Sequence, residues 1–184
     1  DLEKKVEDVI REVEKVLREL RRRHEELTKR SEDAVKETKD RVKEIEDEVR
    51  RVVDKVRKDI KDKDTLERVE RKAEEVIRRL RRILEENKKS ADRDVRRNED
   101  MLRRVEKTVR DVKRKLERVL KDLKTDELVK ELKRDVERVL KRLKERSDEV
   151  RKESEKSIKK SKDSLEKAER EVREMLRDLD RETK

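Results

Sequence analysis

Apolar residues recur along this chain with an 18-residue period, and this repeat limits the fold more than any other feature of the sequence. In the first third the pattern starts at Leu2, Val6, Val9, Val13 and Val16 and continues in steps of four and three residues. Five such steps make 18 residues, or 3.6 residues per turn, which is the period of an α-helix. A sustained repeat of seven would instead impose a left-handed supercoil. The pattern therefore predicts straight helices in an untwisted bundle.

The composition excludes most other fold classes. The chain has 184 residues, of which 63% are Asp, Glu, Lys or Arg, and it lacks Gly, Pro, Cys, Trp, Tyr and Phe. Turn-rich sheets and disulfide-bonded folds depend on several of these residues. High charge is also typical of disordered chains, but those lack a sustained hydrophobic period. No apolar run is longer than two residues, so we expect a soluble chain without a membrane span or a targeting signal.

Two short stretches interrupt the repeat and predict where helices end. They are KDKDT at 61–65 and KTDE at 124–127. We expect Asp64 to cap the second helix, with Glu67 three residues later, and Thr125 to precede the third in the same way. The expected helices cover about residues 2–61, 65–123 and 126–182, each roughly 90 Å long at 1.5 Å per residue. They form a single three-helix domain over residues 1–184.

The three apolar patterns also share one register. If the chain folds back near residues 63 and 125, position x of the first helix faces about 126 − x in the second and x + 123 in the third. Val6 then faces Leu120 and Val129, to within one residue. Short connections favour antiparallel neighbours. The predicted fold class is all-α: a single-chain antiparallel (up-down-up) three-helix bundle that closes its core within one chain, so we expect a monomer.

The 18-residue repeat, the Leu and Val core and the Glu, Lys and Arg surface resemble those of parametrically designed (de novo) untwisted three-helix bundles, over essentially the whole chain. The resemblance implies a monomeric bundle with no evolved function. Two features depart from it: the connections lack the glycine that such designs often use, and the middle of the core is polar. Spectrin-like natural repeats are the nearest natural alternative, but the missing aromatic residues and the straight period argue against them.

Serine occupies positions 154, 157, 161 and 164, at the spacing where the helices elsewhere carry Leu or Val. The predicted register places Ser154 in one layer with Ser31 and Asp94. It places Ser161 in another layer with Thr38 and Asn87. A buried polar group without a partner costs about 2 to 7 kcal/mol, so grouping them is what a buried hydrogen-bond network requires. The candidate residues for a buried polar network or a pocket lining are His24, Ser31, Thr38, Asn87, Asp94, Asn98, Ser147, Ser154, Ser157 and Ser161.

Two interpretations of these polar layers remain open. In the first, the layers provide specificity, because a polar layer penalises the wrong helix register or order whereas a uniform Leu and Val core does not. In the second, they line a small-molecule pocket. The layers from Ser31 to Thr38 contain no large hydrophobic residue and could open a cavity near the lower end of ligand sites, about 300 Å³. Val35, Val95 and Ile158 flank this stretch.

We predict no enzyme activity, no cofactor and no required partner. His24, Asp94 and the serines are the residue types of a catalytic triad, but the register separates His24 from Asp94 by about 10 Å along the helix axis. One His and no Cys do not make a zinc site. The net charge of +10 permits weak, salt-sensitive adsorption to polyanions. Acidic residues are interleaved and no aromatic residue can stack on a base, so no specific nucleic-acid partner is predicted.

Overall fold

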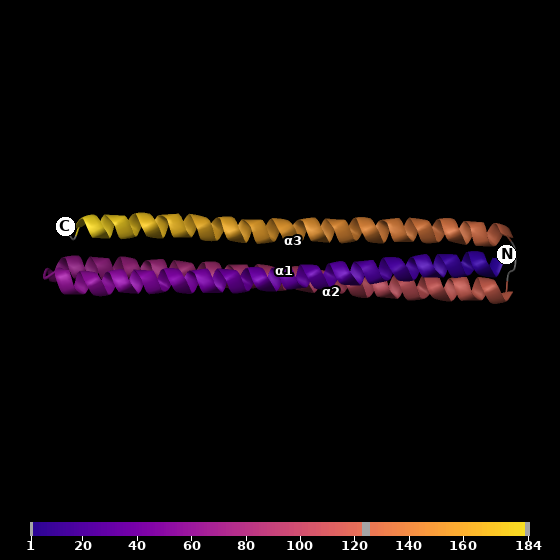
Figure 1. Ribbon diagram of the computed structural model, residues 1–184, viewed down its shortest axis with the longest axis horizontal. Helices are drawn as coiled ribbons and strands as arrows, with labels where there is room; N and C mark the ends of the chain where they lie inside the picture. The colour runs from indigo at the N-terminus through magenta and orange to yellow at the C-terminus, as the bar shows by residue number, and fades with distance from the viewer. Residues whose placement is uncertain (1, 123–125, 183–184) are drawn as a thin grey trace. The chain divides into compact units, whose positions relative to one another are not determined.

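Three long helices make up the regular structure of residues 2–122 and 126–182, the part of the chain that the computed structural model describes. They are α1 (Leu2–Asp59), α2 (Lys63–Asp122) and α3 (Asp126–Glu182), labelled in Figure 1. Each helix begins and ends within two residues of its predicted bounds. The protein is an all-α three-helix bundle, which confirms the predicted fold class. None of the three helices has an apolar stretch long enough to cross a membrane.

Each of two compact units contains a segment of all three helices. Among the described residues, unit 1 comprises residues 2–30, 93–122 and 126–154, and unit 2 comprises residues 31–92 and 155–182. Each of α1, α2 and α3 contributes residues to both units. Each unit has its own buried apolar cluster, so the two clusters are described separately.

The core of unit 1 joins aliphatic side chains from all three helices. Leu20 of α1, Val105 of α2 and Val136 of α3 are almost completely buried in it. Val6 and Val129 belong to this cluster and Leu120 packs against it half-buried, as their predicted common layer requires. The other buried members are Val9, Val13, Val16, Leu17, Met101, Val109, Leu116 and Leu140.

The core of unit 2 is also built from aliphatic side chains of all three helices. Val49 of α1 and Val69 and Leu80 of α2 are each about 1% exposed. Val172 of α3 is buried in the same cluster. Leu84 packs half-buried against the cluster one turn after Leu80. The other buried members are Val42, Ile45, Val53, Val56, Ala73, Leu165, Ala168 and Leu176. Aliphatic burial of this kind is the main favourable term in helix packing, since few isolated helices are stable in water.

Ion pairs between helices give the register independently of the apolar residues. The residue numbers of four α1–α2 pairs add up to 127 in each case, and those of two α2–α3 pairs add up to 250. The apolar pattern predicts 126 and 249, so the two readings agree to within one residue. The α1–α2 pairs are Glu14–Lys113 (2.9 Å) and Arg21–Glu106 (3.2 Å) in unit 1, and Glu46–Arg81 (3.4 Å) and Arg57–Glu70 (2.9 Å) in unit 2. The α2–α3 pairs are Arg97–Glu153 (3.3 Å) in unit 1 and Arg79–Glu171 in unit 2.

Asp62 caps the N-terminus of α2. The sequence-based prediction of Asp64 as the cap was therefore wrong. The Asp62 carbonyl oxygen accepts the first helical bond of α2, from Leu66 N–H (3.1 Å). Its carboxylate accepts bonds from Asp64 N–H (3.3 Å) and the Thr65 hydroxyl (2.8 Å). These are the roles of an N-cap residue. No described residue has a positive φ, so this connection has no need of glycine. The other predicted cap, Thr125, lies outside the described residues.

Replacing Asp62 with Ala should therefore lower the free energy of unfolding by about 0.5 to 2 kcal/mol, because two donors of the first turn lose their acceptor. Asp64→Ala is the matched control. It removes only a favourable charge near the helix N-terminus, an effect of about 0.3 to 1 kcal/mol. Urea unfolding followed by circular dichroism measures both. A larger loss for Asp64→Ala than for Asp62→Ala would restore the cap predicted from the sequence.

Candidate functional site

Five of the ten predicted polar residues lie in unit 1. Asp94, Asn98, Ser147 and Ser154 are buried, with Ser154 only 1% exposed. His24 is half-buried. Asp94 also has an interaction partner. The four buried residues occupy positions where the 18-residue pattern would otherwise put Leu or Val.

The imidazole of His24 has one nitrogen that is both buried and unbonded. His24 Nδ1 has no hydrogen-bond partner among the described residues, and neither has the hydroxyl oxygen of Thr28, one turn further along α1. A catalytic histidine needs a carboxylate or a carbonyl on one ring nitrogen to hold its tautomer and orientation. The described residues supply no such partner to His24 Nδ1.

The other five predicted residues lie in unit 2. Ser31, Thr38 and Asn87 are buried, whereas Ser157 and Ser161 are half-buried. Ser164, the last serine of the α3 series, is exposed. Ala34, four residues before Thr38, and Ala91, four residues after Asn87, are half-buried as well. The α3 serines therefore lie increasingly close to solvent from position 154 to position 164.

Hydrogen bonding around Asn87 differs from a closed network. The Thr38 hydroxyl donates to the Ala34 carbonyl oxygen of its own helix (2.9 Å), so its proton is not directed to another helix. Asn87 is 7% exposed, and its Nδ2 has no hydrogen-bond partner in the described part of the chain. A buried amide donor left without an acceptor costs about 1 to 3 kcal/mol. Unit 2 thus holds a donor for which the described side chains supply no acceptor.

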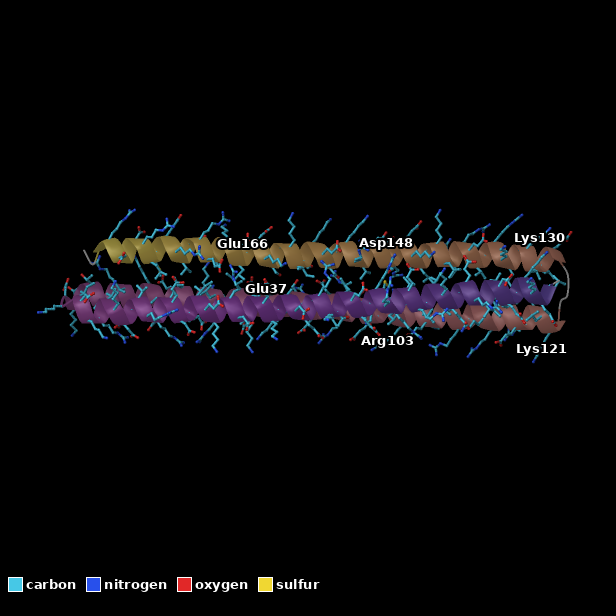
Figure 2. All side chains as sticks on the ribbon, in the orientation of Figure 1. Glu37, Arg103, Lys121, Lys130, Asp148 and Glu166 are labelled. Atoms are coloured by element: carbon cyan, nitrogen blue, oxygen red, sulfur yellow. The ribbon has the colours of Figure 1, made fainter. Side chains whose placement is uncertain are left out.

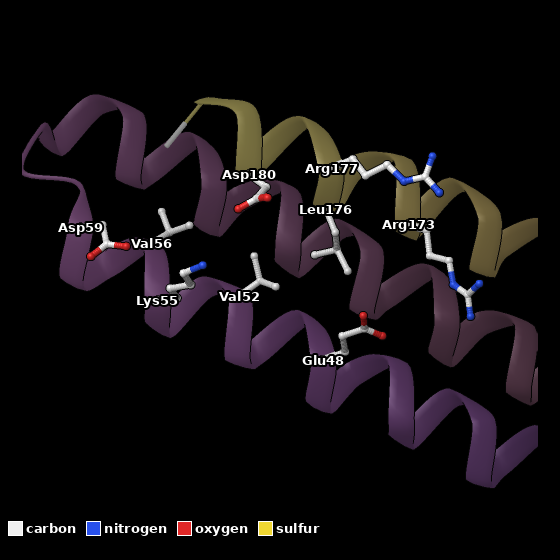
Figure 3. A pocket seen from close by; sticks show the side chains of 9 residues that line it. All are labelled: Glu48, Val52, Lys55, Val56, Asp59, Arg173, Leu176, Arg177 and Asp180. Atoms are coloured by element: carbon white, nitrogen blue, oxygen red, sulfur yellow. The ribbon is translucent and has the colours of Figure 1, made fainter. Parts of the chain in front are cut away.

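A surface groove of about 400 Å³ lies elsewhere in unit 2, between the last turns of α1 and α3. In Figure 3 the side chain of Leu176 on α3 points toward α1, and Val52 and Val56 lie next to each other on α1. Its rim carries equal numbers of acidic and basic side chains: Glu48, Asp59, Asp180, Lys55, Arg173 and Arg177. None of the ten predicted residues lines it. No pattern in the sequence predicts this groove, because its rim has the same mixed charge as most of the surface.

The interhelical ion pairs are mostly exposed, and three of them shift a pKa. Hydrogen bonds to Glu169 and Glu70 raise the pKa of Arg41 and of Arg57, and the third pair involves Glu14. A hydrogen bond from Lys113, followed by the positive charge of that side chain, lowers the pKa of Glu14. A carboxyl group whose pKa is lower in the folded state stabilises the fold above its ordinary pKa, and this contribution is lost as the pH falls. Exposed pairs of this kind contribute little to the free energy of unfolding. Their value here is that they identify which residues of neighbouring helices face each other.

Replacing Lys113 with Met should raise the pKa of Glu14 back toward its ordinary value, because the hydrogen bond and the adjacent charge are both removed. An NMR titration of the Glu14 side-chain carboxyl carbon is the measurement. Lys115→Met removes an exposed charge on the same helix and should leave the Glu14 titration almost unchanged. If the two variants shifted Glu14 equally, the cause would be net charge and not the contact with Lys113.

Metal binding has little support from the side chains. In the described ranges, no three His, Cys, Asp or Glu side chains are grouped as a metal site would require. The groove between α1 and α3 is lined by carboxylates and cations together. Cations at the rim oppose binding of a metal ion by the nearby carboxylates.

Comparison with known proteins adds no function to these observations. No protein-family model, no curated protein and no solved structure matches the chain. The three-helix fold by itself hosts many unrelated functions and therefore implies none. The function must be inferred from the side chains of the polar core and of the surface.

Proposed function

We propose that the chain is a designed, monomeric structural scaffold without catalytic activity, in which polar core layers select one arrangement of three long helices. The observation that carries this proposal is the burial of polar side chains at core positions that the repeat would fill with Leu or Val. These side chains are Ser31, Thr38, Asn87, Asp94, Asn98, Ser147 and Ser154. The 18-residue repeat, the restricted composition and the lack of any matching family support a designed origin.

The polar layers select an arrangement because a misplaced layer exposes polar groups to an apolar environment. Within unit 2, a slip of seven residues between α1 and α2 keeps nearly the same helix faces in contact. It would place Thr38 opposite Leu80 in place of Asn87. A core made only of Leu and Val would pay no such penalty, because every layer is alike. Buried polar groups are known to specify register in this way at some cost in stability.

The test compares the parent with an apolar-core variant in which all seven buried polar residues are replaced by Leu or Val. The chain has no Cys, so pairs of cysteines can report register through a short bis-maleimide cross-linker. R21C/E106C joins residues that form an ion pair (3.2 Å), and R21C/E99C reports the slip of seven residues that places Thr38 opposite Leu80, about 10 Å along the axis.

The parent should have the mass of one chain and cross-link at R21C/E106C alone. The apolar-core variant should resist denaturant better but should also cross-link at R21C/E99C or form dimers. If it remained a monomer with the parent register, the polar layers would not be needed for specificity. A dimeric parent would contradict the monomeric scaffold directly. Catalysis is not expected from either protein.

A second candidate function is binding of a small molecule in the polar part of unit 2. The unpartnered amide donor of Asn87 favours it, because such a donor can bond to an acceptor on a ligand. The half-buried residues Ala34, Ala91 and Ser157 have small side chains, and the predicted register places them in the layer next to Asn87. A ligand for this place is small and carries a strong hydrogen-bond acceptor, such as an amide or a sulfoxide.

Calorimetry with acetamide, benzamide and dimethyl sulfoxide tests this second candidate. Binding to the parent that disappears in Asn87→Leu would support it. Thr38→Val is the control, because the Thr38 hydroxyl already bonds within its own helix and should not be needed. Equal heats of binding for the parent and Asn87→Leu, or no heat of binding with any of the compounds, would contradict a ligand site at Asn87. The structural scaffold would then be the better supported function.

A further inference from the structure

A row of exposed cations runs along the outward face of α2 in unit 1. We call it the α2 cationic stripe. Its members follow steps of four, three, four, four and three residues, so at 100° per residue they lie within an arc of about 80° on one side of the helix. Over 18 residues the stripe is about 27 Å long. It consists of Arg103, Lys107, Arg110, Arg114, Arg118 and Lys121, all of them exposed. Figure 2 labels its two ends, Arg103 and Lys121, which both lie at the lower margin of the view.

Almost all of this charge is unpaired. Arg103 lies 3.9 Å from Asp100, and both side chains are largely exposed. The other five cations make no ion pair with the side chains that the structure describes, those of residues 2–121, 127–178, 180 and 181. The acidic residues of this stretch that face solvent, Asp111 and Glu117, lie outside the central line of the stripe. The stripe therefore presents continuous positive charge along one face of the helix.

The same face of α2 in unit 2 is different, although the helix and the repeat are the same. There the exposed cations alternate with acids at the same angular positions. Arg78, for example, lies 3.5 Å from Glu74, which precedes it by one turn. Interspersed charge of both signs is the ordinary pattern of a soluble helical surface. The residues of this mixed face are Glu67, Arg71, Glu74, Arg78, Arg82, Glu85, Lys89 and Asp92.

We propose that the α2 cationic stripe is a binding surface for the phosphate backbone of double-stranded nucleic acid, independent of base sequence. Four of its six members are arginines, whose planar guanidinium groups donate two parallel hydrogen bonds to one phosphate. Cations aligned along a helix displace the counterions condensed on a duplex, which is the main source of sequence-independent affinity. No aromatic side chain is present to stack on an unpaired base, so a duplex fits better than a single strand.

An anionic membrane is a poorer partner for this surface. Helices that bind membranes insert an apolar face beside their basic residues. All exposed residues between positions 103 and 121 are charged, so this face has nothing to insert. A single row of cations also suits a line of phosphates better than a plane of lipid headgroups.

The experiment measures binding of a fluorescently labelled DNA duplex by anisotropy between about 50 and 200 mM salt. If all six cations neutralise phosphates, the logarithm of the affinity should fall with the logarithm of the salt concentration with a slope of about −5. That slope corresponds to a loss of roughly a thousandfold over this range. R110Q/R114Q should reduce the slope by about 2 and weaken binding roughly fiftyfold at about 0.1 M salt.

R78Q/R82Q is the matched control, because it removes two arginines from the mixed face of the same helix and leaves the same net charge. It should bind the duplex nearly as well as the parent. All four positions are exposed, and circular dichroism verifies that both variants remain helical. An equal loss in the two variants would show that net charge alone drives binding and would overturn the proposal. So would undetectable binding at about 50 mM salt, or equally tight binding to vesicles containing phosphatidylserine.

Discussion

Replacing Leu80 with Ala is expected to lower the free energy of unfolding by about 2 to 5 kcal/mol. Leu80 is 1% exposed and lies in the centre of the unit 2 core, where it packs with side chains from the other two helices. The loss has two parts: the transfer of three carbon atoms out of an apolar environment, and the cavity that remains because three packed helices cannot fully collapse around it. Guanidinium unfolding followed by circular dichroism measures the change.

Leu84→Ala is the control for this prediction. It makes the same chemical change on the same helix, one turn later, at a half-buried position. Water already reaches this side chain, so less apolar area is lost and no closed cavity forms. The cost should therefore be clearly smaller than at Leu80. Equal costs at the two positions would mean that Leu80 is not at the centre of the packed layer.

Replacing Asn87 with Leu is expected to raise the free energy of unfolding by about 1 to 3 kcal/mol, against the usual direction of a core substitution. The Asn87 amide is buried, and its Nδ2 lacks an acceptor within the described residues. Leu removes this desolvation cost and adds apolar surface to the core, while its side chain has a similar length. The same unfolding measurement applies.

Thr38→Val separates this effect from a general preference for apolar cores. The Thr38 hydroxyl donates to the Ala34 carbonyl oxygen, so its polar group is already satisfied, and Val has nearly the same shape. We expect a change smaller than about 1 kcal/mol. If Asn87→Leu were destabilising, the amide would have an acceptor in solution, and a bound molecule at Asn87 would become the better explanation.

Much of the fold could be predicted from the sequence because its determinants are periodic and local. A 3.6-residue period fixes both the helix and the face that it buries, and this accounts for Val6, Leu80 and Val172 lying in the core. The relative numbering of the three patterns also predicted the register, which the ion pairs such as Arg21–Glu106 reproduce to within one residue. The two α1–α3 pairs agree less well. Arg23–Asp148 and Arg41–Glu169 are offset by 125 and 128 residues, where the apolar pattern predicts 123.

The candidate site was less predictable, since its properties depend on which way individual side chains turn. Position in the repeat placed Asn98 and Ser154 where the structure buries them. The repeat predicted His24, Ser157 and Ser161 as core residues on the same grounds, but these three are only half-buried. A helical period assigns a residue to a face about 100° wide, and the edge of that face is open to solvent. Whether a serine lies at the centre or the edge depends on the packing of the neighbouring helices.

The sequence by itself determined the three helices, their antiparallel order, their register and the placement of polar residues among the apolar ones, because spacing along the chain controls each of these. Only the tertiary structure decided that Asp62 caps α2, that the Thr38 hydroxyl turns to its own helix, and that a groove forms beside Leu176. These features depend on distances between atoms and on side-chain rotamers. Neighbouring positions with the same residue type, such as Asp62 and Asp64, are equivalent in the sequence until the backbone orients one of them toward the free N–H groups of the helix.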